Sequence, residues 1–174
     1  HYPLRRQRQM CIRDRMDRET LMAIRKLRII ARHGIGVDQI DLDTATEKGI
    51  VVTYTPQANS DAVAEYAIAL MLNIMKSVQR AHEETRKGNW RRFLGFEIMN
   101  KTVGIVGFGA IGRSVAKKLS GLEVKILACD PYVSDQDIRT GGATPVSLEE
   151  LLRSSDVVSL HTALTPETRH LLNR

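Results

Sequence analysis

The pattern Gly-x-Gly-x-x-Gly at residues 107–112 constrains the fold of this chain more than any other feature. It follows the apolar run 101–106 directly and precedes residues 111–119, whose apolar positions recur at helical spacing. Glycines at this spacing are a weak signal alone. Between a strand and a helix, however, the first glycine permits a tight turn and the third lets the helix pack closely on the strand. The pattern therefore predicts a βα unit.

Further strands and helices alternate on both sides of this unit. We predict strands at 27–31, 50–54, 124–129 and 156–161, and helices at 18–26, 42–48, 147–153 and after Thr165-Pro166. The apolar strand 156–161 is typical of one buried on both faces of a parallel sheet. The fold class is therefore α/β, with a Rossmann-type doubly wound parallel sheet that is incomplete because too few strands are present.

One long helix is predicted over residues 61–87. Its apolar residues, Val63, Tyr66, Ala67, Leu70, Met71, Ile74 and Met75, recur at steps of three and four, and Gly88 ends it. At about 1.5 Å per residue this helix would reach roughly 40 Å. Such a length suits a connector between domains or a subunit interface.

The glycine pattern and one acidic residue together indicate a dinucleotide. Gly109 would let a diphosphate approach the backbone at the start of the helix, where the amides favour negative charge. Asp130 follows the next strand, 18 residues after Gly112, at the position of an acid that accepts bonds from ribose hydroxyls. A carboxylate there repels a 2′-phosphate, which favours NAD over NADP. The alternative is an aspartate that only ends a strand or caps a turn.

Composition and charge exclude several classes of protein. Residues 1–15 carry a net charge of +4 out of the chain's +6, and we interpret them as a non-native tail, not a nucleic-acid-binding arm. No apolar run reaches the roughly 18 residues that span a membrane. The two cysteines form no disulfide framework, and no zinc spacing occurs. We expect a cytoplasmic protein without metal, nucleic-acid or membrane partners.

Three further features receive a structural interpretation from the residues alone. The turn Gly34-Ile35-Gly36 follows a strand and could direct amides at an anion, but its spacing favours a structural turn. His33 and His161 have no visible carboxylate partner, so neither is assigned as an acid or base. Glu65 is interpreted as a solvated or interface charge.

Several stretches together resemble one family. These are RHGIGVDQIDLDTATEKGI, SDAVAEYAIALML, KGNW, KTVGIVGFGAIGRSVA, ACDPY and SLHTALTPETRHLLN, and they run in order from about residue 21 to residue 174. They resemble the NAD-dependent D-2-hydroxyacid dehydrogenases, with the phosphoglycerate dehydrogenase branch nearest. The resemblance implies hydride transfer between NAD and a 2-hydroxy or 2-oxo acid. A non-catalytic NAD-sensing corepressor of the same fold stays open as the alternative.

The resemblance also implies a domain organisation. Residues 16–57 resemble part of a flavodoxin-like substrate domain, and residues 58–174 resemble a truncated NAD-binding domain that begins with a long connecting helix. That helix takes part in dimerisation in the family, so a homodimer is expected for the full-length protein. The active site of the family lies in the cleft between the two domains.

Individual site residues follow from the matching stretches. The turn at Ile35 and Gly36 resembles the loop whose backbone holds the substrate carboxylate, which reverses the structural interpretation of that turn. The residues implied for the coenzyme are Gly107, Gly109, Ala110, Ile111 and Gly112 beside the diphosphate, Asp130 and Pro131 at the ribose, and Thr162 in a lining loop.

The sequence departs from the family's pattern at three places. Ala110 stands where relatives often have Arg, which removes a phosphate contact, and Ala163 stands where Pro is common. The family's catalytic Arg, Glu and His lie downstream of residue 174, and His161 does not match that His. We therefore assign no catalytic residue and expect this sequence to be an internal piece of a longer dehydrogenase.

Overall fold

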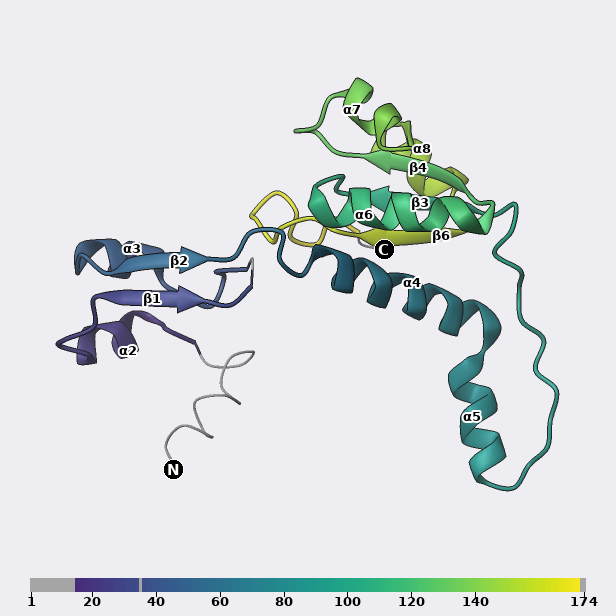
Figure 1. Cartoon of the computed structure of the whole chain (residues 1–174), viewed down its shortest axis with the longest axis horizontal. Helices are drawn as coiled ribbons and strands as arrows, with labels where there is room; N and C mark the ends of the chain where they lie inside the picture. Colours follow the sequence, from purple (N-terminus) through teal and green to yellow (C-terminus); the bar gives the residue numbers. More distant parts are fainter. Residues whose placement is uncertain (1–14, 35, 173–174) are drawn as a thin grey trace. The chain divides into compact units, whose positions relative to one another are not determined.

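The structure is a computed structural model that describes residues 15–34 and 36–172. The chain divides into two compact units, one ending at Ala58 and the other beginning at Asn59 (Figure 1). Each unit contains its own parallel strands and its own buried apolar cluster. The predicted tail, residues 1–15, lies almost entirely outside the described residues.

The first unit is a pair of parallel strands with two short helices. Strands β1 (Ile29–Arg32) and β2 (Val51–Tyr54) pair in parallel, and helices α2 (Arg18–Ala23) and α3 (Leu42–Glu47) accompany them. Its buried cluster consists of Leu21, Ala45 and Ile50. Helix α2 ends earlier than predicted because the Lys48 ammonium donates to the carbonyls of residues 21 and 24 at its end. This is a small core for an independently folded region.

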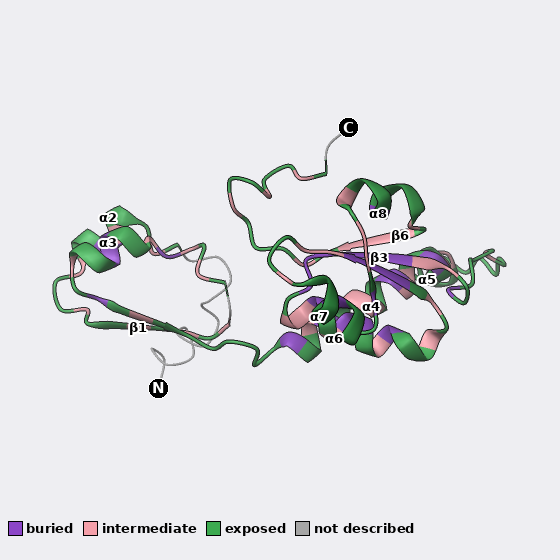
Figure 2. Ribbon diagram, turned by 90° about the horizontal axis from the view of Figure 1, so that it is seen from above, coloured by how far each residue is buried: buried purple, intermediate pink, exposed green. Residues whose placement is uncertain are grey.

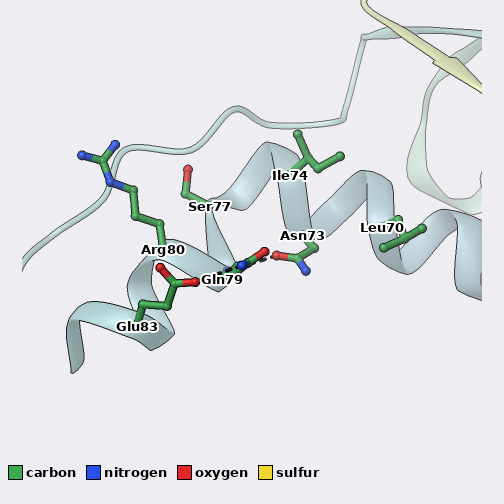
Figure 3. Close-up of a pocket in the computed structure, with 7 residues that line it drawn as sticks. All are labelled: Leu70, Asn73, Ile74, Ser77, Gln79, Arg80 and Glu83. Atoms are coloured by element: carbon green, nitrogen blue, oxygen red, sulfur yellow. Dashed lines mark hydrogen bonds between the residues drawn. The ribbon is translucent and has the colours of Figure 1, made fainter. Parts of the chain in front are cut away.

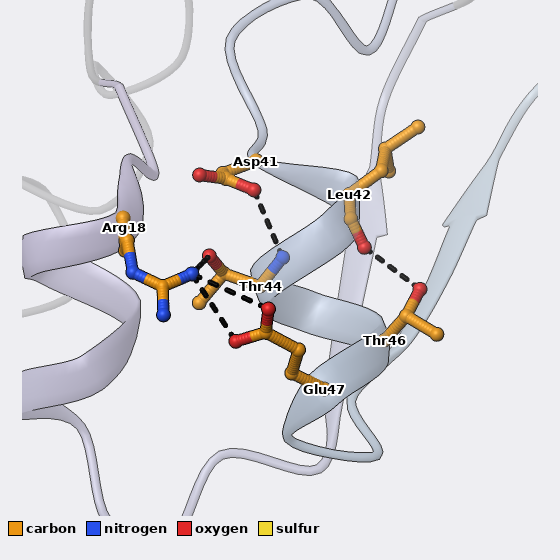
Figure 4. A network of polar contacts seen from close by, with 6 residues as sticks. All are labelled: Arg18, Asp41, Leu42, Thr44, Thr46 and Glu47. Carbon is orange, nitrogen blue, oxygen red and sulfur yellow. Dashed lines mark hydrogen bonds and ion pairs between the residues drawn. The ribbon is translucent and has the colours of Figure 1, made fainter.

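Polar contacts fix how the two helices of this unit meet (Figure 4). The Asp41 carboxylate accepts a bond from the Thr44 amide at 2.9 Å and caps the start of α3. The Arg18 guanidinium donates to the buried Thr44 hydroxyl at 3.2 Å and to the Glu47 carboxylate at 3.1 Å. Arg18 thereby links α2 to α3.

The second unit contains a four-stranded parallel sheet in the order β5-β4-β3-β6. Its strands are β3 (Thr102–Val106), β4 (Lys125–Cys129), β5 (Thr144–Pro145) and β6 (Val157–Leu160). By position in the chain this order is 3-2-1-4, which is the order in a doubly wound dinucleotide-binding sheet. The predicted α/β class and parallel sheet are confirmed.

Helices cover both faces of this sheet (Figure 2). One face packs against α4 (Ser60–Lys76), α6 (Ala110–Leu119) and α7 (Asp135–Thr140) around Val103 and Ile105, and the other against α8 (Leu148–Ser154) through Leu151. Gly104 lies in the centre of β3 against α8, where a Cβ atom would collide with the Leu151 side chain. Burial on both faces explains the near-continuous apolar strands.

Two short elements were not predicted, and one predicted helix is absent. Helix α7 and the two-residue strand β5 were not predicted, since both are too short to show periodicity. The helix predicted after Thr165 is instead a run of turns over 166–170. There the Thr168 hydroxyl bonds the Ala163 carbonyl, and the Thr165 amide donates to the same hydroxyl. These side-chain bonds offer the backbone an alternative to a helix.

The predicted single long helix is wrong, because it breaks at Ser77 into α4 and α5 (Val78–Arg86). Ser77 has a left-handed backbone with φ 53°. In an unbroken helix the Gln79 amide would donate to the Met75 carbonyl. Instead it donates to the Asn73 side chain at 3.1 Å, and the Met75 carbonyl accepts from the Phe96 amide at 2.8 Å. The returning chain therefore occupies the acceptor that a continuing helix needs.

Candidate functional site

A cavity of about 420 Å³ lies at the carboxyl ends of β3, β4 and β6. The strand order of the sheet reverses between β3 and β6, which is where ligands bind in open parallel sheets. The cavity is lined by Val106, Gly107, Gly109, Cys129, Asp130, Pro131, Tyr132, Leu148, His161, Thr162, Ala163, Thr165, Glu167, Thr168 and Leu171.

The glycine loop between β3 and α6 forms one wall of this cavity. Gly107 has φ 91°, and a Cβ atom there would lie 2.8 Å from the carbonyl carbon and oxygen of His161. A Cβ atom on Gly112 would collide with the Gly107 carbonyl oxygen, so the turn closes on itself only with glycine. Gly109 differs, since a Cβ atom there meets nothing within 4 Å and the residue lines the cavity. The loop therefore leaves open space above its backbone.

Phe108 anchors this loop in the apolar core of the second unit. The ring is fully buried in the apolar cluster that also contains Ile138 of α7. It lies so close to Gly141, at the end of α7, that a Cβ atom there would come within 2.6 Å of Phe108 Cε1. The role of Phe108 does not follow from the local sequence, because its packing depends on α7, which was not predicted.

Asp130 connects the end of β4 to the glycine loop. Its Oδ2 accepts a bond from the Phe108 amide at 2.7 Å, and its Oδ1 accepts from the Tyr132 amide at 2.8 Å. Bonds of amides to a carboxylate are among the stronger hydrogen bonds in proteins. The carboxylate therefore holds the loop in place and also faces the cavity.

Two ionisable groups at the carboxyl ends of β4 and β6, Cys129 and His161, are neutral at pH 7. Burial lowers the pKa of the half-buried His161 ring, whose Nε2 lies 2.9 Å from the Ser159 hydroxyl. Burial, and then the neighbouring Asp130 charge, raise the pKa of the Cys129 thiol. The protonated Cys129 thiol is therefore a poor nucleophile.

The predicted site residues fall into three places. Gly107, Gly109, Asp130, Pro131 and Thr162 come together around the cavity. Ala110, Ile111 and Gly112 form the first turn of α6 beside it. Gly36 belongs to the first unit, where its carbonyl accepts a bond from Arg32 Nε at 3.1 Å, and Ile35 lies outside the described residues.

The wall formed by the chain after β6 was not predicted from the sequence. Glu167, Thr168 and Leu171 line the cavity from a segment that was predicted to be a helix. The TPET stretch itself, residues 165–168, was visible in the sequence, but nothing local indicates that it folds back over the glycine loop.

Within the described ranges, no group of three or more potential metal ligands occurs. Over the same residues, none of the helices has the length and apolarity to cross a membrane.

Comparison with known proteins identifies the fold and its ligand class. The model of the family "D-isomer specific 2-hydroxyacid dehydrogenase, NAD binding domain" matches residues 68–174, which is more than half of the chain. This chain belongs to that family. The match confirms the expected family and the expected NAD cofactor class.

Individual relatives of this dehydrogenase domain have similar sequences and structures. The chain is 41% identical over 162 residues to a D-3-phosphoglycerate dehydrogenase of Archaeoglobus fulgidus, covering 92% of this chain and 31% of the relative. It is 39% identical over 170 residues to a glyoxylate reductase of Thermococcus litoralis, covering 92% and 51%. A solved D-lactate dehydrogenase of Aquifex aeolicus, in complex with NAD and lactic acid, has a TM-score of 0.81 and 35% identity, covering 93% and 49%. The chain thus spans between about a third and a half of these proteins.

One structural observation indicates that the described residues can accommodate the NAD diphosphate. The backbone around Gly109 is open on the cavity side, and a side chain at that position would fill the space. The helix that begins at Ala110 directs its first amides toward the same loop, where an anion is favoured.

Proposed function

We propose that this chain forms the coenzyme-holding part of an oxidoreductase that transfers hydride between NAD and a 2-hydroxy or 2-oxo acid. The observation that supports this most is the cavity that joins the glycine loop to Asp130 at the switch point of the sheet. The named activities of the relatives, D-3-phosphoglycerate dehydrogenase and glyoxylate reductase, give the substrate class. When bound, NAD supplies or accepts the hydride, and the residues of this chain hold and orient it.

The proposed coenzyme residues divide by the part of NAD that they would hold. The amides of Gly109, Ala110 and Ile111 would bind the diphosphate, with Gly107 and Gly112 shaping the turn. Asp130 and Pro131 would bind the adenosine ribose, and Thr162 would line the coenzyme from β6. A fixed coenzyme contributes to the rate by orientation, which converts an encounter into a reaction within one complex.

The first unit is proposed as part of the substrate domain, covering residues 16–57, with residues 58–174 as the truncated NAD-binding domain. We propose that the backbone of Ile35 and Gly36 holds the substrate carboxylate. The turn is already constrained, because the Gly34 amide donates to the Thr55 hydroxyl at 2.9 Å and Gly34 has φ 130°. No catalytic residue is proposed within this chain.

Titration with NADH tests the coenzyme site. The 174-residue chain should quench or shift NADH fluorescence on binding, and Gly109→Val should weaken binding by roughly tenfold or more because the added carbons fill the cavity. Gly121→Val is the matched control, since a Cβ atom there also meets nothing within 4 Å but Gly121 does not line the cavity. Absence of NADH binding by the unaltered chain contradicts the proposal.

Turnover tests the proposed reaction. The longer protein that contains this chain should oxidise NADH in the presence of at least one acid from a panel of 2-oxo acids. Gly109→Val should reduce this rate in step with its loss of NADH affinity. A protein that binds NADH and turns over no acid on the panel contradicts the proposed enzyme and supports an NAD-sensing protein instead.

We propose that the full-length protein is a homodimer that uses the outer face of α4. Tyr66, Leu70 and Ile74 follow one another at four-residue steps, and Ile74 is 79% exposed. They are distinct from Met71 and Met75, which are buried on the opposite side against the sheet. A hollow of about 530 Å³ opens beside Leu70 and Ile74 where α4 meets α5 (Figure 3). An apolar stripe of this kind is typical of a subunit interface.

The mass of the protein in solution tests this interface. Ile74→Glu should convert a dimer into a monomer in sedimentation or light-scattering measurements, because a charge would be buried without a partner. Glu65 lies on the same helix and pairs with Lys118 at 3.0 Å, and Glu65→Gln should leave the dimer intact.

We also propose a cytoplasmic location, which the NAD requirement and the free thiol of Cys129 support. Cell fractionation tests it.

A further inference from the structure

The coenzyme cavity contains a second carboxylate besides Asp130. Glu167 lines it from the turn after β6, whereas the glycine loop lines it from the end of β3. Asp130 and Glu167 are the two acidic residues of the described lining, and that lining contains no Lys or Arg. Arg169 is two residues from Glu167 but does not line the cavity. The side chains that line the cavity therefore carry a net negative charge at neutral pH.

Glu167 is held in place and carries its charge. Its turn is fixed by the Thr168 hydroxyl, which donates to the Ala163 carbonyl at 2.6 Å and accepts from the Thr165 amide at 2.7 Å. A hydrogen bond with the Thr165 side chain lowers the pKa of the Glu167 carboxyl. No ion pair between described residues involves Glu167. Its charge is therefore not neutralised by a basic partner there.

The Asp130 carboxylate differs from that of Glu167 because backbone amides offset part of its charge. Both of its oxygens accept bonds from backbone amides, of Phe108 and of Tyr132. Those amide dipoles offset part of the field that the Asp130 carboxylate directs into the cavity. A second acid at the same cavity adds a field that is not offset in this way.

We propose that Glu167 is a specificity-determining residue that acts with Asp130 to disfavour a 2′-phosphorylated coenzyme, NADPH, against NADH. This inference rests on the proposed coenzyme site. A 2′-phosphate adds close to two negative charges at the adenosine ribose, and like charges within one cavity repel at short range. NADH lacks that group, so the same acid costs it little. Selection against NADPH is then shared between two carboxylates from segments that follow different strands.

Binding measurements on the full chain test the proposal through the ratio of the dissociation constants for NADPH and NADH. We expect Glu167→Gln to lower this ratio by roughly three- to tenfold, mainly through tighter NADPH binding, and Glu167→Lys to lower it further. Glu167→Asp keeps the charge and should keep most of the discrimination. Raising the salt concentration should shrink the effect of Glu167→Gln, because exposed charges are screened.

Two controls separate the outcomes. Glu149→Gln removes the same charge from the exposed face of α8, outside the cavity lining, and should leave the ratio unchanged. Thermal melting checks that each variant is folded. An unchanged ratio in Glu167→Gln and Glu167→Lys, with NADH binding intact, overturns this inference alone. Failure of the unaltered chain to bind NADH overturns the proposed coenzyme site, and this inference with it.

Discussion

At the scale of single residues, Asp130 combines a proposed role at the ribose with an observed role in the glycine loop, and a sequence pattern does not separate the two. The pattern places it at the ribose, whereas the structure also shows its carboxylate holding the Phe108 amide of the glycine loop at 2.7 Å. A loop held this way presents its amides in a fixed geometry before the coenzyme arrives, which reduces the ordering cost of binding. Asp130 therefore holds the geometry of the loop, and we propose that it also acts on coenzyme choice.

Replacement of Asp130 should reveal both roles. Asp130→Ala should relax the preference for NAD over NADP, and it should also lower the free energy of unfolding by about 1–3 kcal/mol because two amides lose their acceptor. Calorimetry for binding and thermal melting for stability measure the two effects. Asp135→Asn on the exposed side of α7 is the control. An unchanged coenzyme ratio together with unchanged stability would remove both roles from Asp130.

His161 gives a pH dependence with a defined sign. Burial lowers its pKa from the ordinary 6.5, so the folded protein binds fewer protons than the unfolded chain as the pH falls through that value. Stability should therefore be full at pH 7 and above and should decrease as the pH falls below about 6.5. Carboxyl groups with lowered pKa, such as Asp156, affect the pH dependence of stability at lower pH. His161→Gln should flatten the decrease seen in thermal melting, and His82→Gln should not.

At the scale of elements, the junction of α4 and α5 depends on the chain that returns to it. Gly95 lies so close to this junction that a Cβ atom would come within 2.8 Å of the Met75 carbonyl oxygen. Gly95→Ala should therefore lower the free energy of unfolding by about 1–3 kcal/mol in a denaturant titration. Gly121→Ala, where a Cβ atom meets nothing within 4 Å, should change it by less than about 0.5 kcal/mol. Equal effects of the two substitutions would contradict this account.

The elements also show which parts of the fold are encoded locally. The turn from β3 to α6 was predictable because the apolar strand, the three glycines and the helix are consecutive in the sequence. The break at Ser77 was not, because residues 61–87 contain no Gly or Pro and the cause lies near residue 95. For the same reason the sequence pattern predicts Asp130 as a site residue and does not predict Glu167. Asp130 ends a strand, whereas Glu167 reaches the cavity only through the fold of its turn.

At the scale of the whole molecule, the charge of residues 1–15 should have no part in coenzyme binding. The cavity is lined by residues 106–171 of the second unit, and the diphosphate would be held by amides of the glycine loop. Deletion of residues 1–15 should therefore leave the dissociation constant for NADH within about twofold, as fluorescence titration measures it. A large loss of affinity would show that the basic segment contributes to the site.

The two units should also differ in stability within one chain. The first unit buries the small cluster Leu21, Ala45 and Ile50, whereas the second buries both faces of a four-stranded sheet. Because stability grows with buried apolar surface, amides of β1 and β2 should exchange with solvent deuterium much faster than those of β3 and β4.

Bound coenzyme should slow amide exchange further in the second unit and so increase the difference between the two units. NADH at about 100 times its dissociation constant stabilises the folded form that binds it by about 2.7 kcal/mol. Added protection should therefore appear in the segments that line the cavity, residues 106–109, 129–132 and 161–171. Exchange followed by mass spectrometry resolves these segments, with Gly109→Val as the variant in which the same NADH concentration should add less protection. Protection of β1 and β2 equal to that of β3 and β4 without coenzyme would contradict the inference from core size. Added protection that avoids the lining segments would instead contradict the position of the coenzyme site.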